Sequence, residues 1–254
     1  MINFLRKIRR NMILNEKTGR YIKYAIGEIL LVVIGIVIAL QLNIANEARK
    51  SRKLEQDYYC RLFEDSNQDV ARIQEYIDET KNRIHNANLL LSMLQKGEKG
   101  KKVIFNQYAA SVARMAAIFH PNTSAFDDLK SSGNLNIIRD VSIKNTMNEY
   151  YVFIEGFINV VELNSDAAMD VIFNVDNYQD AGWAEWEYTD AAIDSTLVNK
   201  AILNKEKNLT DAHIKKYTSD IIIIIGLNNR NLNRYHIMQE EILRVNSLLQ
   251  KKCK

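Results

Sequence analysis

The strongest pattern in the chain is a continuous apolar stretch near its beginning. The stretch Ala25–Leu42, AIGEILLVVIGIVIALQL, contains one charged residue, Glu28. A helix of this length covers about 27 Å at ~1.5 Å per residue, which is close to the roughly 30 Å of hydrocarbon in a bilayer. The pattern predicts a transmembrane helix over residues 24–43, a basic tail over residues 1–23 and a folded domain over residues 44–254.

Two other interpretations of the apolar stretch stay open. A cleaved signal peptide needs a shorter apolar core followed by small residues, and the following segment QLNIANEARK (41–50) offers only a poor cleavage site. A buried core helix is the second alternative. We favour a retained anchor because the stretch passes directly into helix-compatible sequence. The run Ile221–Ile225 is too short for a second span and is interpreted as core.

Beyond the span, apolar residues recur at alternating steps of three and four, which is the spacing of a seam along a long helix. The first seam consists of Tyr59, Phe63, Ser66, Val70, Ile73, Ile77, Thr80, Ile84, Ala87, Leu91 and Leu94. The second consists of Ile143, Met147, Tyr150, Ile154, Phe157, Val161, Asn164, Ala168, Val171 and Val175. The third consists of Ile214, Tyr217, Ile221, Ile224, Asn228, Asn231, Tyr235, Met238, Ile242, Val245 and Leu249.

Shorter elements are expected between the seams. The glycines and lysines of KGEKGKK end the first long helix, and a second helix is expected over Val103–Phe119, limited by Pro121. Ser124 gives an N-cap signal for a short helix over AFDDLK (125–130). Asp140 is positioned to cap the helix of the second seam.

Composition agrees with a few long helices, because the chain has one proline and nine glycines and no long alternating strand pattern. We expect an all-α protein with an N-terminal transmembrane helix followed by a coiled-coil-like bundle of long helices. The seams can close within one chain or between chains. We favour a homo-oligomer or a membrane protein partner, because the helix of the first seam continues from the span. The asparagines of the second and third seams can help to set the register of the paired helices.

Charge sets the expected orientation. A net charge of +3 is too small to indicate a nucleic-acid partner. Seven basic residues precede the span against Glu16 alone, whereas the four basic residues that follow it are diluted by three acidic ones. The positive-inside rule then favours a cytosolic N-terminus and a large domain outside. The tail carries apolar residues at helical spacing, so it is either a helix lying on membrane lipid or a solvated basic tail; these residues are Phe4, Leu5, Ile8 and Met12.

Glu28 shares one face of the span with small residues. On an ideal helix Gly35 and Ala39 each lie about 20° from it, and a small-xxx-small pair permits close approach of two helices in lipid. Glu28, Gly35 and Ala39 are therefore a candidate packing face. The carboxylate can instead reach back toward the headgroups or Lys23. Proton or ion coupling is the weakest alternative, since no second ionisable residue accompanies Glu28 within the span.

We identify no catalytic residue, metal ligand or cofactor motif. The four histidines have no metal-ligand spacing, and His236 with Glu240 is interpreted as a surface pair. Cys60 and Cys253 form no metal or redox motif, so their oxidation state and the compartment stay open. We therefore expect a protein that is not an enzyme.

The most site-like feature is the acidic aromatic segment DNYQDAGWAEWEY, which carries Trp183, Trp186 and Tyr188. Either its aromatic residues pack the segment onto the bundle, or they form an exposed docking loop for a partner, since Trp and Tyr are frequent binding anchors.

Two blocks of the sequence resemble an uncharacterised bacterial family of single-span membrane proteins, classed as a domain of unknown function. The first comprises RKIR (6–9), YAIGEI (24–29), LVVIGI (31–36) and IALQ (38–41). The second comprises Leu129, Ser131, Ser132, Gly133, Leu135, Ile138, Asp140, Tyr150 and Tyr151. One departure is Ala45, where the family commonly carries Trp. The resemblance implies a Gram-negative inner-membrane protein, and it implies no activity, ligand or catalytic residue.

The leading hypothesis is a membrane-anchored helical interaction or scaffold protein of the bacterial inner membrane, with a periplasmic bundle and self-association through the span. The alternative is a periplasmic sensor-type domain that binds a small ligand between its helices and signals through a separate partner. A pocket lined with polar groups would favour this alternative.

Overall fold

The computed structural model describes residues 18–205 and 208–253. Within these residues all regular structure is helical, and the only strand-like contact is an isolated bridge between Gly100 and Asn208. The all-α prediction is therefore confirmed. The chain divides into two compact units, residues 1–55 and residues 56–254.

The described part of the first unit is the beginning of helix α2 (Thr18–Gln95). Its most apolar 18-residue window has a mean hydropathy of 2.6, and none of that window is buried. Among the described residues, α2 is the one helix long and apolar enough to cross a membrane by length and composition. Residues 1–17, which carry most of the predicted amphipathic tail, lie outside the described residues.

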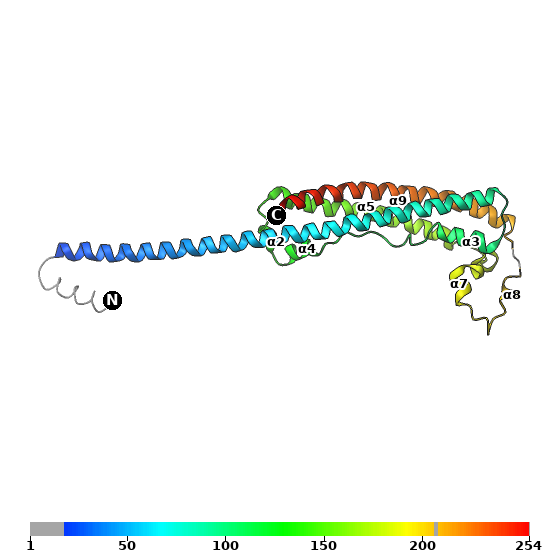
Figure 1. Cartoon of the computed structure of the whole chain (residues 1–254), viewed down its shortest axis with the longest axis horizontal. Coiled ribbons are helices and arrows are strands. Elements are labelled where there is room, and N and C mark those ends of the chain that lie inside the picture. Colours follow the sequence, from blue (N-terminus) through cyan, green and yellow to red (C-terminus); the bar gives the residue numbers. More distant parts are fainter. Residues whose placement is uncertain (1–17, 206–207, 254) are drawn as a thin grey trace. The chain divides into compact units, whose positions relative to one another are not determined.

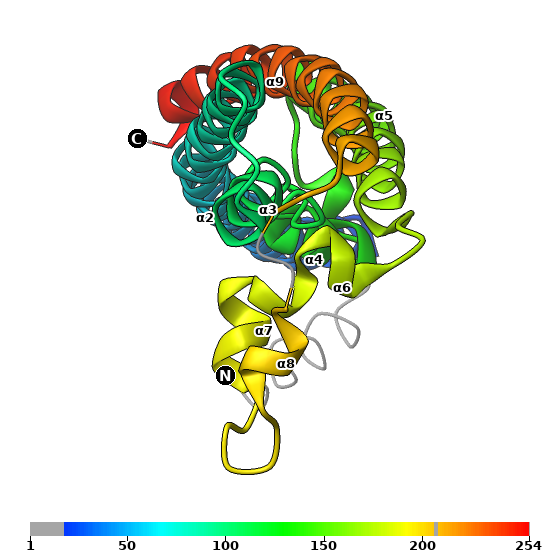
Figure 2. The same ribbon diagram turned by 90° about the vertical axis from the view of Figure 1, so that its right-hand side faces the viewer.

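The second unit is a helical bundle (Figures 1 and 2). Three sides are formed by the rest of α2, by α5 (Val141–Phe173) and by α9 (Asp211–Lys252). Figure 2 shows these helices end-on, with α3 (Lys101–Ala110) and α4 (Ser124–Ser131) on the fourth side. Figure 1 shows that α3 and α4 lie at opposite ends of this fourth side.

Short helices complete the bundle. The turn η1 (Asn134–Asn136) links α4 toward α5. An excursion between α5 and α9 contains α6 (Tyr178–Ala181), η2 (Trp183–Glu185), α7 (Glu187–Ala192) and α8 (Lys200–Leu203). In both views α7 and α8 project to one side of the bundle, at the end where α3 lies (Figures 1 and 2).

The apolar core of the bundle consists of two separate clusters. The first cluster joins α2 up to Ile77, helix α4, the beginning of α5 and the end of α9 from Tyr235. The second joins α2 from Ala87, helix α3, the end of α5 and the beginning of α9 up to Ile224. Each cluster is a closed set of buried apolar contacts, so each stabilises its own end of the bundle.

Buried polar residues occupy the positions between the two clusters on every long helix. They are Thr80 and Arg83 on α2, Asn164 and Ser165 on α5, and Asn228 and Asn231 on α9. Asn164 Nδ2 donates to Asn231 Oδ1 at 2.7 Å, so the layer is bonded across helices rather than only within them. We call these six residues the polar layer.

The predicted second helix is wrong at its C-terminal end. The sequence pattern indicated Val103–Phe119, whereas α3 ends at Ala110 and residues 111–116 form turns. The Ser111 hydroxyl donates to the carbonyl of Tyr108, and Asn228 Nδ2 donates to the carbonyl of Ser111. Phe119 is still fully buried, but in a segment without regular secondary structure. The helical spacing of its apolar residues therefore came from packing onto the bundle and not from a continuous helix.

The predicted seams largely coincide with the buried faces. Ala87, Tyr150 and Met238 are buried as expected, and in the third seam both asparagines are buried too. The pattern overlooked Leu62, Leu90, Ile158 and Ile172, which are also buried. Long helices that touch two neighbours bury a wider stripe than a two-position seam.

The run Ile221–Ile225 is only partly core. Ile221 and Ile224 are buried, whereas Ile222 and Ile223 are exposed.

The helix caps follow from local sequence. Asp140 Oδ1 accepts hydrogen bonds from the backbone N–H groups of Ser142 and Ile143, which confirms the predicted cap of α5. At α4 the N-cap position is Thr123 rather than Ser124, and its side chain makes no capping bond. Asn122 Oδ1 accepts from the Ser124 backbone instead, since an Asx turn offers the same acceptor from one residue earlier.

Candidate functional site

The candidate packing face of the span lies on α2 in the first unit. Glu28, Gly35 and Ala39 are all exposed, and a Cβ added at Gly35 would meet no atom within 4 Å. The surface around Gly35 is therefore open to a second helix. Its use for helix packing stays a prediction.

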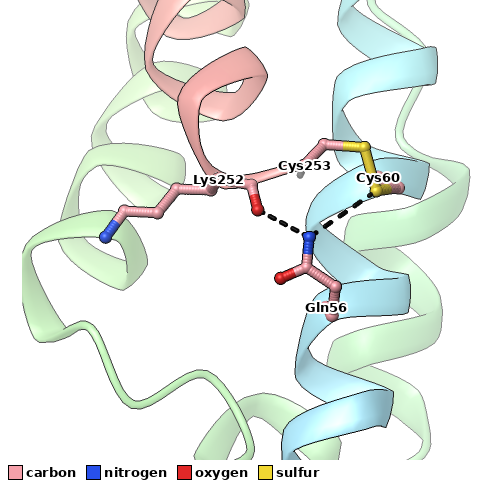
Figure 3. The surroundings of a disulfide bond; sticks show 4 residues. All are labelled: Gln56, Cys60, Lys252 and Cys253. Carbon is pink, nitrogen blue, oxygen red and sulfur yellow. Dashed lines mark hydrogen bonds between the residues drawn. A yellow bond between two sulfur atoms is a disulfide. The ribbon is translucent and has the colours of Figure 1, made fainter.

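A disulfide ties one end of the bundle together. Cys60 on α2 is bonded to Cys253 at the end of α9, with their Cα atoms 4.7 Å apart (Figure 3). Gln56 Nε2 donates to the carbonyl of Lys252 at 2.7 Å, beside the same bond. Lys252 Nζ in turn donates to Asp140 Oδ2 at 2.9 Å, which brings in the N-cap residue of α5. Three long helices are thus joined at this end of the bundle.

The disulfide closes a long loop of chain, since its cysteines are 193 residues apart in the sequence. In the loop-entropy description such a link stabilises the folded state by ~5 kcal/mol, because it restricts the unfolded chain. The oxidation state of both cysteines could not be predicted from the sequence. Nothing in their spacing signalled a pair, because only the antiparallel return of α9 brings Cys253 beside Cys60.

Two buried carboxylates hold the segment that leads into α4. Asp69 accepts from the backbone N–H of Asn122 through both oxygens, at 2.9 and 3.1 Å. Asp65 Oδ2 accepts from the backbone N–H of Ala125 at 2.8 Å. Burial raises the pKa of Asp69 to about 6, against the opposing effects of the Asn122 hydrogen bonds and the Arg72 guanidinium. Burial likewise raises the pKa of Asp65. Desolvation is therefore the largest cause of the raised pKa at both carboxylates.

Arg83 is the charged member of the polar layer. Its guanidinium donates to Asn228 Oδ1 at 2.8 Å, to Thr80 Oγ1 at 2.6 Å and to the carbonyl of Ala113 at 3.3 Å. The side chain is 5 % exposed, and burial lowers the pKa of Arg83. All three acceptors are neutral, so the cation is held by dipoles at the centre of the bundle, a costly arrangement for a buried charge.

An apolar cleft lies at the other end of the bundle. It has a volume of about 440 Å³ and is formed by α3 and the turn after it, by the end of α5 and by residues 183–188. We call it the aromatic cleft, because its walls include the rings of Phe105, Phe173, Trp183, Trp186 and Tyr188. Its size falls within the range of small-molecule sites, roughly 300–1,000 Å³.

The structure places all three predicted docking residues in the wall of this cleft. Trp183 and Trp186 are partly buried against the second core cluster, and Tyr188 is 75 % exposed. The two indole rings lie 5.3 Å apart at 86°, and the Tyr188 ring lies 5.4 Å from that of Trp186. Phe105 joins them, with its ring 5.1 Å from that of Trp183. The pattern of the aromatic segment did not predict the part played by Phe105, because this residue lies on a helix about 80 positions away in the sequence.

The acidic, histidine and cysteine side chains of the described residues are the possible metal ligands. Within residues 18–205 and 208–253 no group of three or more His, Cys, Asp and Glu side chains could hold a metal ion. His213 Nδ1 lies 2.7 Å from the hydroxyl of Thr210, the residue that caps α9. This histidine therefore belongs to a helix terminus.

Together these features define an all-α protein with one candidate membrane-crossing helix and a disulfide-linked helical bundle that carries an aromatic cleft. The chain belongs to a family of unknown function: residues 28–203 match the model of Family of unknown function (DUF6090). The match includes the second block on which the family resemblance was based, and it begins at Glu28 within the first block. The chain matches no curated protein and no solved structure.

Proposed function

We propose that the chain is a membrane-anchored interaction protein of the bacterial inner membrane, with a cytosolic N-terminus and a periplasmic bundle. The bundle acts by binding and not by catalysis, and the span brings two copies, or one copy and a membrane protein partner, together. The disulfide between Cys60 and Cys253 is the observation that carries the proposal.

The disulfide supports the orientation because such bonds persist in oxidising compartments such as the periplasm, and are rare in the cytosol. The basic residues before the span support the same orientation independently, through the positive-inside rule. Two unrelated features thus favour one topology.

Accessible cysteines test the topology. We expect Leu197→Cys, at a position 85 % exposed on the bundle, to react with a membrane-impermeant maleimide in intact spheroplasts. Asn11→Cys, in the basic tail, is expected to react only after permeabilisation. The opposite labelling pattern would overturn the proposed orientation.

Cysteine crosslinking in native membranes tests the association. Gly35→Cys is expected to give a disulfide-linked dimer, because it lies on the face with Glu28 and Ala39. Val37→Cys is the matched control, since on an ideal helix it lies about 180° from Glu28. Absence of a dimer from both positions would contradict self-association through the span.

A sensor-type function is the second candidate, and the aromatic cleft favours it. From the sequence, we expected this function to require a pocket lined by polar groups. The cleft wall is instead largely apolar, so the ligand must be apolar rather than polar.

A further inference from the structure

We propose that the aromatic cleft binds a small molecule with a hydrocarbon body and a hydrogen-bond acceptor, such as a fatty acyl chain with its carbonyl or carboxylate. This inference goes beyond the proposed membrane-anchored interaction function, and it holds whether or not the span self-associates.

The chemistry of the wall selects an apolar ligand. Aromatic rings and aliphatic side chains of α3 and α5, among them Val112 and Ile172, form most of the lining. Two polar side chains of the lining are already engaged within the protein. Asn106 Oδ1 accepts from the backbone N–H of Glu187, and the Arg114 guanidinium pairs with Glu79. What the cleft offers a ligand is therefore chiefly apolar surface, whose burial contributes about 25 cal/mol per Å².

One polar atom beside the cleft lacks a partner. Trp183 Nε1 is the only buried side-chain nitrogen or oxygen without a hydrogen bond among the described residues. Leaving such a donor unsatisfied costs ~1–3 kcal/mol. Nε1 is shielded from solvent, so the acceptor of a ligand in the cleft reaches this N–H when the indole ring turns toward the cleft. The hydrogen bond then removes the cost, so the ligand needs an acceptor as well as a hydrocarbon body.

The backbone that carries Trp183 is held in place by the bundle. Gly182, with φ of +100°, precedes Trp183, and a Cβ there would come within 3.1 Å of Phe105 Cβ and 3.2 Å of the Lys101 carbonyl. Only glycine allows this close approach to α3. The Tyr217 hydroxyl donates to the carbonyl of Ala181 and fixes the preceding residue from α9.

The dimensions favour a small molecule over a protein segment. The cleft is a concave site of about 440 Å³, within the roughly 300–1,000 Å³ that is typical of small-molecule sites. Its two charged lining residues, Arg114 and Glu187, have opposite signs. They impose no net charge on the ligand.

Tryptophan fluorescence tests the proposal without any knowledge of the natural ligand. Both tryptophans of the chain lie in the cleft wall, so intrinsic emission reports on this site alone. The full chain in lipid nanodiscs is titrated with 8-bromooctanoate, whose bromine quenches an indole on contact. We expect saturable quenching. 3-Bromopropionate has the same carboxylate without the chain, and it should quench only in linear proportion to its concentration.

Replacement of one of two neighbouring alanines by phenylalanine provides a test variant and its matched control. Ala113 lines the cleft and is exposed, so Ala113→Phe fills the space, and the apparent affinity is expected to fall at least about tenfold. Ala116→Phe makes the same change at an exposed position outside the lining and should bind like the unchanged chain. If Ala113→Phe loses helical circular dichroism, Ala110→Leu, which also lines the cleft, replaces it.

Three results would overturn the proposal. They are quenching that never saturates, equal affinity in Ala113→Phe and Ala116→Phe, and emission that changes with the density of chains in the disc but not with the probe. The last result would indicate that a second copy occupies the cleft. Nanodiscs made with bromine-labelled phospholipid distinguish the source of the hydrocarbon ligand. Quenching by the labelled phospholipid identifies a lipid acyl chain, whereas quenching only by the soluble probe identifies a free acid.

Discussion

Asp69 shows how one buried carboxylate acts on the fold. The residue is 1 % exposed on α2, yet both its oxygens accept from the backbone of Asn122, and one lies 3.4 Å from the Tyr150 hydroxyl. Arg72 Nη1 is 3.9 Å from Oδ1, at the limit of an ion pair. Desolvation outweighs these favourable contacts, which is why the pKa of Asp69 lies well above that of an ordinary aspartate.

This carboxylate predicts a pH dependence of stability. With a pKa of about 6 in the folded protein and 3.8 in the unfolded chain, the folded state binds the proton more tightly. The free energy of unfolding contributed by this group therefore rises as pH falls from about 6 to about 4, by ~3 kcal/mol for a shift of this size. Asp69→Asn does not titrate. Urea unfolding in detergent should therefore favour the unchanged chain over the variant more at pH ~4 than at pH ~7.

Asp57→Asn, an exposed substitution on the same helix, is the control for the loss of a carboxylate from α2. A stability difference for Asp69→Asn that does not depend on pH would contradict the assigned pKa.

At the scale of elements, the junction of α2 with α9 depends on one covalent bond. The sequence separation of 193 residues makes the Cys60–Cys253 link an effective restraint on the unfolded chain. We expect replacement of both cysteines by alanine to lower the free energy of unfolding by up to ~5 kcal/mol, measured by urea unfolding.

Reduction of the unchanged chain with dithiothreitol should lower its midpoint to that of the double variant, and should leave the variant's own midpoint unaffected. Equal midpoints for the oxidised and reduced protein would show that the bond does not restrain unfolding. In that case the hydrogen bonds of Gln56 and Lys252 would hold the junction by themselves.

Across the whole bundle, the polar layer divides what would otherwise be one continuous apolar core. Arg83 reaches from α2 to Asn228 on α9 and to the turn after α3. Such a layer costs free energy relative to apolar packing, and we expect it to specify the register of the helices, since a shifted alignment would separate its hydrogen-bond partners.

This arrangement predicts a non-additive pair of substitutions. Arg83→Met leaves the acceptors of Asn228, Thr80 and Ala113 without their donor and should destabilise the bundle by ~1–3 kcal/mol or more. Adding Asn228→Leu makes that contact apolar on both sides. The double variant is therefore expected to unfold at higher urea than Arg83→Met alone. A double variant that loses the sum of both single effects would show that the layer has no coupled network.

Prediction from the sequence succeeded where the signal is local or periodic. Spacing alone reveals features that depend on residues a few positions apart. Examples are the seams that contain Tyr150 and Met238, the cap at Asp140 and the turn after α2, which is marked by glycine. The end of α3 was missed, because the competing interactions of Ser111 come from Asn228, which is remote in sequence. Arg83 was missed for a similar reason: nothing near it in sequence signals that its charge is buried.

Only part of the candidate site could be predicted from the sequence, for the same reason. The aromatic segment with Trp183, Trp186 and Tyr188 was recognisable from composition. Its opposite wall, formed by α3 and α5, was not.

By itself, the sequence determined that this protein is all-helical and that one helix is apolar enough to cross a membrane, because periodic patterns and hydropathy are properties of neighbouring residues. Only the tertiary structure decided that Cys60 meets Cys253, that a polar layer separates two cores, and that the tryptophans line a cleft together with α3. Each of these depends on where the long helices return beside one another. That arrangement is set by packing among residues tens to hundreds of positions apart, which no local pattern encodes.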